Sequence, residues 1–203
     1  MYKKFIKKYL DIFFGVIFLI LLTPIWIIIY LYLLATIGKP VIFKDQRAGI
    51  NGYPFTLFKF RTMAIKKSNE YSITDDKKRV LKKTLFFRAS RLDEIPQLIN
   101  VVKGELSLVG PRPLLLEYNS IYSLKHRKRL EIRPGITGWS QINMKLLTSW
   151  SQKFDLDVWY VNNVSLILDL KIILKTFVFL IKGLFNKNRY NNNLFSEKFN
   201  GKN

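Results

Sequence analysis

The hydropathy pattern is dominated by one uncharged apolar run near the start of the chain. No charged residue occurs from Ile12 to Ile37. As a straight helix this run would extend roughly 39 Å, which exceeds the roughly 30 Å hydrocarbon core of a bilayer. A signal peptide has a much shorter apolar region, followed by a small-residue cleavage site that is absent here. The pattern therefore predicts a membrane-embedded helix within residues 1–37.

Thr23 and Pro24 interrupt this run near its middle. Proline lacks an N–H donor and its ring clashes with the carbonyl four residues earlier, so we expect the helix to kink there. Lysines lie on both sides of the run, so the positive-inside rule does not orient it. Two topologies remain open from the residues alone. One is a kinked helix that spans the bilayer, and the other is a re-entrant helical hairpin whose two ends lie on the same face.

The rest of the chain predicts a small mixed domain over residues 38–186 and a polar tail over 187–203. Two short β-like runs, 41–43 and 54–58, flank a glycine-containing turn and predict a β-hairpin. Helices are expected over residues 76–88, 94–103 and 114–130. The tail is rich in Asn and Lys, and we expect it to be a loose surface segment.

A last apolar run, residues 166–185, carries three lysines, Lys171, Lys175 and Lys182. At 100° per residue these lysines share one face, and the other face is apolar. An amphipathic helix in the membrane interface, with its lysines reaching the headgroups, explains the pattern, although a helix packed on the domain core is the alternative. The expected fold class is thus α+β and mostly helical, with a membrane helix, interfacial amphipathic helices and a short β-hairpin.

Composition narrows the possible functions. The 203 residues include 34 Lys and Arg against 14 Asp and Glu, a net charge of +20, and 49% are hydrophobic. This apolar content excludes general disorder. The absence of Cys excludes disulfides, thiol catalysis and Cys-ligated zinc, and the single histidine, His126, excludes multi-His metal sites. The positive charge indicates a polyanionic partner, either nucleic acid or an anionic membrane surface.

Two adjacent acids, Asp93 and Glu94, stand out in this basic chain. One interpretation is structural, because Ser90 and Asp93 are spaced as in an N-terminal capping box and acids suit the first turn of a helix. The other is catalytic, because a helix N-terminus favours the ionised carboxylate that a nucleophile or a Mg²⁺ ligand needs. Arg88 and Arg91 lie nearby and could hold phosphates. The residues alone favour the capping interpretation.

Three further segments carry candidate chemistry. Pro111 and Pro113 fix the backbone around Arg112, and a stiff loop that presents one guanidinium suits phosphate binding, although a structural turn is the alternative. The loop at 133–141 has two glycines and a tryptophan, so it could receive a base or sugar ring or simply cap the core. Strand alternation would place Lys59 and Arg61 on one face.

Together these motifs resemble the bacterial sugar transferase family, the small monotopic phosphoglycosyl transferases that begin glycan assembly on a lipid carrier. Similarity is greatest to catalytic-domain-only members of the PglC type and covers essentially the whole chain. It is carried by QRAG (46–49), FKFRTM (58–63), RASRLDEIPQLINVVKGELSLVGPRP (88–113), RPGITGWSQIN (133–143) and FDLDVWYV (154–161). An Asp-Glu pair followed by Gly-Pro-Arg-Pro at this spacing is a specific signature.

The resemblance implies an activity and its partners. The family transfers a phospho-sugar from a UDP-sugar, usually an acetamido sugar, to undecaprenyl phosphate, releases UMP and uses Mg²⁺. The implied location is the cytoplasmic face of the bacterial inner membrane, with a re-entrant N-terminal helix kinked at a Ser-Pro pair that corresponds here to Thr23 and Pro24. Anionic membrane lipids are expected partners and nucleic acid is not. The oligomeric state stays open.

The resemblance also assigns residues. Asp93 and Glu94 correspond to the catalytic dyad, and we expect Asp93 to be the nucleophile and both acids to serve as metal ligands. Pro111, Arg112 and Pro113 correspond to a loop implicated in nucleotide binding. Arg88, Lys59 and Arg112 are the candidates for phosphate binding, because fixed cationic side chains can stabilise the negative charge of a phosphoryl group.

One departure from the family pattern affects specificity. Where relatives of this type usually read Gly-Arg-Asn, this chain reads Met144-Lys145-Leu146. Lys145 keeps the charge of a nucleotide-binding candidate but loses the bidentate fork, so the identity of the sugar becomes less predictable than the reaction. The alternative function is a non-catalytic basic membrane anchor, which leaves the Asp-Glu pair and the Pro-Arg-Pro loop unexplained.

Overall fold

The structure, a computed structural model, describes residues 2–65, 79–144, 149–184 and 199–201. Lys145, residues 76–78 of an expected helix and most of the expected tail lie outside this part of the chain. Within it the protein is mostly helical and has two small two-stranded sheets. The expected α+β class is therefore confirmed at this level.

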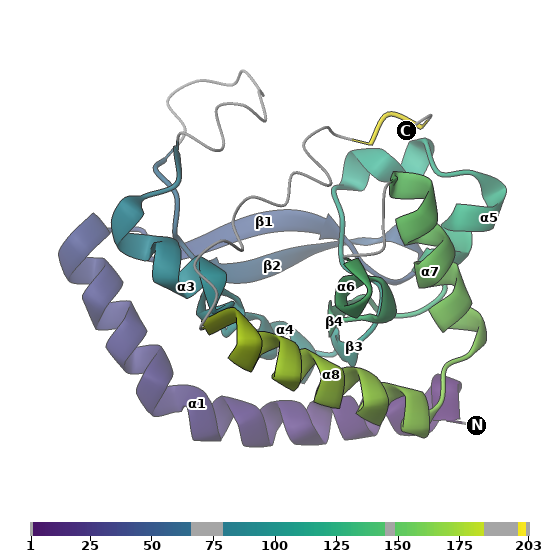
Figure 1. Cartoon of the computed structure of the whole chain (residues 1–203), viewed down its shortest axis with the longest axis horizontal. Coiled ribbons are helices and arrows are strands. Elements are labelled where there is room, and N and C mark those ends of the chain that lie inside the picture. The colour runs from purple at the N-terminus through teal and green to yellow at the C-terminus, as the bar shows by residue number, and fades with distance from the viewer. Residues whose placement is uncertain (1, 66–78, 145–148, 185–198, 202–203) are drawn as a thin grey trace.

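Helix α1 (Lys7–Ile37) follows a π-helical turn at Tyr2–Ile6 and is continuous through Pro24. Within the described residues it is the helix long and apolar enough to cross a membrane. It bends partway along its length (Figure 1), as a proline inside a helix favours. The Thr23 hydroxyl donates to the carbonyl of Leu19 at 2.7 Å. Large apolar side chains on the outer face of α1 are exposed, Ile20, Leu21 and Ile28 among them.

The first turns of α1 are held by buried ion pairs. Lys7 Nζ lies 2.6 Å from Asp169 Oδ2 in α8 (Leu166–Leu184). One turn later, Asp11 pairs with Arg133 at 3.1 Å and accepts a hydrogen bond from the Ser107 hydroxyl at 2.7 Å. All of these contacts join the start of α1 to segments that follow it by at least 90 residues.

The other end of α1 contacts the same domain. Arg61 donates to the carbonyls of Ile37 and Gly38 at 2.6 and 2.8 Å, and thereby caps the C-terminus of the helix. Between its ends α1 packs on α4 (Gln97–Val102). Gly15 allows this close approach, because a Cβ there would lie 2.8 Å from a methyl group of Val101. Both ends of the apolar helix are thus fastened to one domain.

The expected hairpin is confirmed and is longer than the sequence indicated. Strand β1 (Ile42–Ala48) pairs antiparallel with β2 (Pro54–Phe60), in a register that places Ile42 opposite Phe60. Phe55 and Leu57 pack on α4 in one of the core clusters. Asn100 of α4 accepts from the N–H of Phe58 and donates to the carbonyl of Thr56, so the helix and the strand are held in register.

A second sheet consists of two short parallel strands, β3 (Ser107–Val109) and β4 (Gly135–Thr137). Gly110 and Gly135 lie so close that a Cβ on Gly135 would approach the Gly110 nitrogen to 2.0 Å. Trp139, at the start of α6 (Trp139–Ile142), stacks on Trp159 of α7 (Trp150–Asn162) with ring centroids 4.8 Å apart. The glycine-rich loop at 133–141 therefore packs inside the domain.

Helix boundaries are where the sequence expectations are least accurate. The helix expected over 94–103 begins three residues later, as α4. The described part of the helix expected over 76–88 is a 3₁₀ turn at Lys82–Thr84 followed by α3 (Leu85–Ala89). The expectation of one helix over 114–130 is wrong. That segment forms two 3₁₀ turns, Leu116–Ser120 and Lys128–Leu130, around α5 (Leu124–Arg127).

The C-terminal end corrects the expectation of a loose tail at one point. Phe199 is buried in an aromatic cluster with Tyr118, Tyr122, Trp150 and Phe154, and its N–H donates to the Tyr118 hydroxyl at 3.3 Å. An aromatic side chain buries a large apolar area, which outweighs the cost of ordering a short polar segment.

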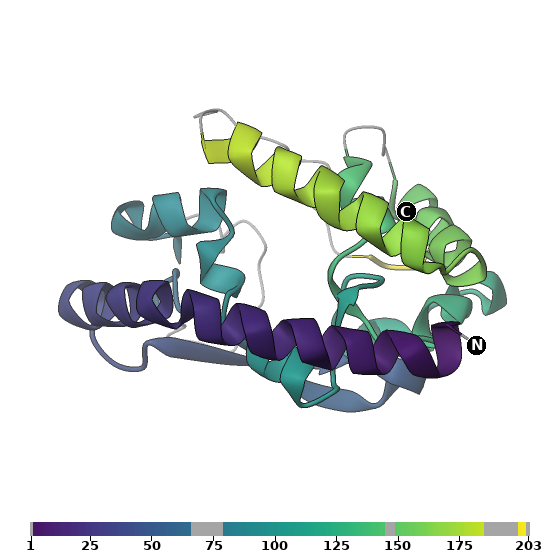
Figure 2. The same cartoon turned by 90° about the horizontal axis from the view of Figure 1, so that it is seen from below.

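Helix α8 keeps much of its apolar surface exposed. Its exposed large side chains are Leu166, Ile167, Leu170, Leu174, Phe177, Val178 and Ile181. Seen from below, α8 and α1 run across the same side of the molecule (Figure 2). The opposite face packs on the domain, because Ile172 is buried in a core cluster. Helix α8 thus combines a core-packed face with an exposed apolar face, and its place in the membrane interface stays a prediction.

Candidate active site

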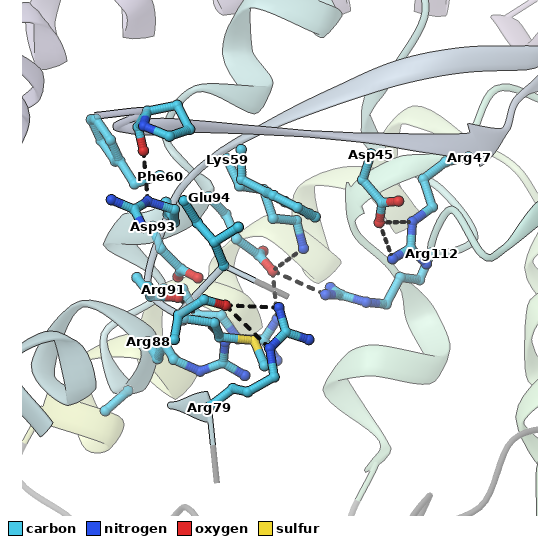
Figure 3. A pocket seen from close by; sticks show the side chains of 18 of the residues that line it. Asp45, Arg47, Lys59, Phe60, Arg79, Arg88, Arg91, Asp93, Glu94 and Arg112 are labelled. Atoms are coloured by element: carbon cyan, nitrogen blue, oxygen red, sulfur yellow. Dashed lines mark hydrogen bonds and ion pairs between the residues drawn. The ribbon is translucent and has the colours of Figure 1, made fainter. Parts of the chain in front are cut away.

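A cavity of about 680 Å³ opens between the β-hairpin, the Asp93-Glu94 turn and the Arg112 loop (Figure 3). Phe179 of α8 lines its edge. The charged residues that line it are Asp45, Arg47, Lys59, Arg61, Arg79, Arg88, Arg91, Asp93, Glu94 and Arg112. Within the described residues, seven basic side chains thus face three acidic ones, and the cavity is suited to an anionic ligand.

The backbone around the acidic pair differs from a capping box. The Ser90 hydroxyl turns back to the Phe86 carbonyl at 2.7 Å and closes the end of α3. Arg91 then adopts a left-handed conformation, with φ 61° and ψ 15°, and precedes a 3₁₀ turn at Leu92–Glu94. The capping interpretation of Ser90 and Asp93 is therefore wrong. A non-glycine residue with positive φ is uncommon and is found at constrained sites.

Glu94 is the electrostatic centre of the cavity. Its Oε1 atom lies 3.0 Å from Arg112 Nη2, 3.2 Å from Arg91 Nη1 and 3.5 Å from Lys59 Nζ. Burial opposes ionisation, but these three cations outweigh it and hold the pKa of Glu94 well below its usual range. Figure 3 shows the three side chains converging on this one carboxylate.

Asp93 is electrostatically the opposite of its neighbour. Within the described part of the chain, no hydrogen bond or ion pair engages its carboxylate, which is 9% exposed. Burial, followed by repulsion from Glu94, raises the pKa of Asp93 to about 6. Glu94 is a fixed counterion to the cations, whereas Asp93 is a carboxylate available to a ligand.

This contrast gives a prediction about stability. The pKa of Asp93 is higher in the folded than in the unfolded protein, so its ionised form opposes folding above pH 6, and the penalty is relieved as the pH falls. In metal-free buffer at pH 7.5, we expect Asp93→Asn to raise the melting temperature by several degrees, since two pKa units correspond to about 3 kcal/mol. Thermal denaturation of both proteins from pH 7.5 to 4.5 should show the difference between their melting temperatures becoming smaller. A difference in melting temperature that does not change with pH would contradict the raised pKa of Asp93.

The structure brings most of the sequence-predicted site residues together. Lys59, Arg88 and Arg112 all line the cavity. Lys59 shares the face of β2 that packs on α4, and burial lowers the pKa of its ammonium group to about 8. Pro111 and Pro113 are buried and are not among the residues that line the cavity, so their part in nucleotide binding stays a prediction. Met144 lines the cavity beside the undescribed Lys145.

Several lining residues were missed by the sequence interpretation. Asp45 and Arg47 form an ion pair beside Arg112 (Figure 3). Together with Phe43 they occupy alternate positions of β1, so the period-two pattern of the strand could have found them. Arg79 also faces the cavity and donates to the carbonyl of Ala64 at 2.8 Å.

The residues present fit a magnesium ion in one specific way. No group of three or more His, Asp or Glu side chains that could hold a metal is found in the described residues. Mg²⁺, however, commonly takes one or two carboxylates and completes its shell with phosphate oxygens and water. The carboxylate of Asp93 and the Oε2 atom of Glu94, which makes no contact among the described residues, are ligands of the kind that such an ion takes.

Comparison with known proteins identifies the family. The family model for bacterial sugar transferases matches residues 2–183. An uncharacterized sugar transferase of Bacillus subtilis, EpsL, is 47% identical over 167 residues, which are 81% of each chain. The UDP-glucose:undecaprenyl-phosphate glucose-1-phosphate transferases of Klebsiella pneumoniae and Escherichia coli are 36% and 34% identical over 91% and 92% of this chain.

The extent of these matches differs. This chain spans only 41% and 42% of the length of the Klebsiella and Escherichia proteins, whereas it spans most of the Bacillus protein. In all three cases the match covers at least four fifths of this chain. Over that length, and with a family model that matches residues 2–183, the chain belongs to the bacterial sugar transferase family.

Proposed function

We propose that this chain is a phosphoglycosyl transferase that moves a phospho-sugar from a UDP-sugar to undecaprenyl phosphate and releases UMP. The observation that carries the proposal is the carboxylate of Asp93, which no side chain of the described residues pairs, in a cavity that seven of their cationic side chains line. A nucleoside diphosphate-sugar is an anionic ligand of the size such a cavity accepts. The names of the Klebsiella and Escherichia relatives support the same reaction class.

The reaction proceeds in two displacements at one phosphorus atom. A carboxylate oxygen of Asp93 attacks the β-phosphorus of the donor, and the bond from that phosphorus to the bridging oxygen breaks. The electron pair of this bond leaves with UMP, and the phospho-sugar remains on Asp93 as an acyl phosphate. An oxygen of the acceptor phosphate then attacks the same phosphorus, the bond to Asp93 breaks, and the free carboxylate returns.

The neighbouring side chains supply charge stabilisation. Arg112 and Lys59 are already oriented by Glu94, so they can receive the phosphate charge with little reorganisation. Arg88 donates to the Thr62 hydroxyl at 3.3 Å and lines the same wall. Mg²⁺, bound by Asp93 and Glu94, would neutralise charge on the diphosphate. In this account Glu94 positions cations and Asp93 makes the covalent bond.

We further propose that α1 is re-entrant and that the domain lies at the cytoplasmic face of the inner membrane, against its anionic lipids. Ion pairs of Lys7 and Asp11 fasten one end of α1 to the domain, and Arg61 fastens the other. A helix that crossed the bilayer would have to separate its ends by the full hydrocarbon thickness, and one domain could not hold both. The shared outer side of α1 and α8 supports this orientation.

The chain contains no Cys, which allows a direct test of topology. Lys8→Cys and Lys39→Cys place single thiols at exposed positions, one in the first turn of α1 and one just after its end. We expect a membrane-impermeant maleimide to label both in inside-out vesicles and neither in intact spheroplasts. Labelling of one position from each side would show that α1 spans the bilayer.

The donor sugar is tested with a panel. Purified protein in detergent, with Mg²⁺ and undecaprenyl phosphate, is assayed for UMP release from UDP-glucose, UDP-galactose and UDP-acetamido sugars. The relatives' names favour UDP-glucose, whereas the family resemblance favours an acetamido sugar. Release of UMP that depends on the acceptor supports the proposal. If none of these donors is turned over while UDP binds, a non-catalytic membrane anchor becomes the better account.

A further inference from the structure

A buried arginine outside the cavity contacts the backbone of Arg112. Arg129 belongs to a basic run, and Arg127 and Lys128 beside it are exposed, as a charged run usually is. Arg129 itself is only 2% exposed, in the 3₁₀ turn at Lys128–Leu130. A guanidinium in that position is costly to bury unless every N–H group finds a partner.

The partners of Arg129 fix its guanidinium from three sides. Its Nε and Nη2 atoms donate to Asp157 Oδ2 at 3.1 and 3.0 Å, and its Nη1 atom donates to the Tyr122 hydroxyl at 3.0 Å. Asp157 is 1% exposed, and its Oδ1 atom accepts from the Ser140 hydroxyl at 2.6 Å. Every nitrogen of the Arg129 guanidinium and both carboxylate oxygens of Asp157 thus have a hydrogen-bond partner, and the Arg129-Asp157-Ser140 group joins α6, α7 and the turn that carries Arg129.

The remaining bond of this unit reaches the active site. Arg129 Nη2 donates to the carbonyl oxygen of Arg112 at 2.7 Å. Arg112 lies between Pro111 and Pro113, and prolines have no N–H to anchor the loop. At its other end, the Arg112 side chain contacts Glu94 at 3.0 Å. Arg112 is thus held at two points: Arg129 contacts its backbone carbonyl, and Glu94 contacts its guanidinium.

We propose that Arg129 is a positioning residue for the transferase reaction: through the Arg112 carbonyl it aims the Arg112 guanidinium at the donor phosphates. This inference rests on the proposed function. Lysine cannot replace Arg129, because one ammonium group lacks the planar fork that serves Asp157, Tyr122 and the carbonyl together. Misplacing a catalytic cation by about 1 Å costs on the order of 100-fold in rate at most.

The test is a double-mutant cycle of Arg129→Lys and Arg112→Lys, with kcat/KM for UMP release and the melting temperature measured for each protein. We expect Arg129→Lys alone to lower kcat/KM by about 10- to 50-fold. In the Arg112→Lys background, where the fork is already lost, it should lower kcat/KM less than about 2-fold. The fall in melting temperature should be the same in both backgrounds. Equal losses of kcat/KM in both backgrounds would overturn the proposal.

A second readout does not need turnover. Hydrogen exchange of the peptide over residues 108–116 should be faster in Arg129→Lys than in wild type. Arg127→Lys, the same change at an exposed arginine of the same basic run, should leave that peptide unchanged. Unchanged exchange in Arg129→Lys would refute the positioning role, even if no donor is turned over. A wild-type protein that releases no UMP would count against the proposed function alone. Ser140→Ala removes the hydrogen bond from Ser140 to Asp157, so it should speed exchange of the same peptide by a smaller factor than Arg129→Lys does.

Discussion

Asp93→Asn is expected to slow UMP release by about 10⁴-fold or more while the protein remains folded. An amide cannot form the acyl phosphate, so both displacements are lost together. The fold should survive, because the described ion pairs of the cavity are made by Glu94 and Asp45 and leave Asp93 unengaged. Single-turnover UMP release and the melting temperature, measured on the same preparation, check both halves of this expectation.

The matched control is Asp155→Asn, which removes a carboxylate of α7 that pairs with Lys125 and His126 outside the cavity. Its rate should stay within about 2-fold of wild type, because exposed ion pairs contribute little. If Asp93→Asn kept more than about a tenth of the wild-type rate, Asp93 would not be the nucleophile. Its burial would then need another explanation.

Glu94→Gln is expected to damage both activity and stability, which distinguishes it from Asp93→Asn. The change leaves Lys59, Arg91 and Arg112 without their common counterion. Breaking buried pairs of this kind costs several kcal/mol, and we expect about 2–4 kcal/mol because the partners are partly exposed. UMP release should fall by about 100-fold or more. Kinetics and thermal denaturation at pH 7.5 measure the two effects.

Glu131→Gln is the control for this change, since Glu131 is exposed and lies away from the cavity. It should alter neither the rate nor the melting temperature appreciably. A Glu94→Gln protein as stable as wild type would contradict the role of Glu94 as counterion. The opposite signs expected for the melting temperatures of Asp93→Asn and Glu94→Gln follow from one observation: three cations contact one carboxylate and none is paired with the other.

The sequence predicted those features that depend on local pattern. The uncharged run and the β-hairpin follow from hydropathy and period, and the structure has α1, β1 and β2 at those places. The kink was expected from Pro24, and α1 bends there without being interrupted (Figure 1). The dyad and the Arg112 loop were found as motifs, and long-range packing brings them together at Glu94. Strand alternation predicted that Lys59 and Arg61 share a face, and both side chains line the cavity.

The features that the sequence missed depend on tertiary contacts. Ser90 has capping-box spacing, yet its hydroxyl bonds to the preceding helix because Arg91 turns the backbone left-handed. Phe199 sits in a polar tail, and only the aromatic cluster that receives it makes its burial favourable. Arg129 looks like a solvated charge, and Asp157, 28 residues later, makes it a buried one. No local rule reports partners at such separations.

The covalent phospho-sugar on Asp93 can be detected by intact-protein mass spectrometry. Wild-type enzyme is mixed with Mg²⁺ and the preferred UDP-sugar in the absence of undecaprenyl phosphate, then quenched within the first turnover. We expect the mass to increase by one phospho-sugar, which peptide analysis locates on Asp93. The increase should be absent from Asp93→Asn and should be lost when the acceptor is added. An enzyme that turns over the donor with acceptor, yet never carries the phospho-sugar, would instead show direct transfer between the two substrates.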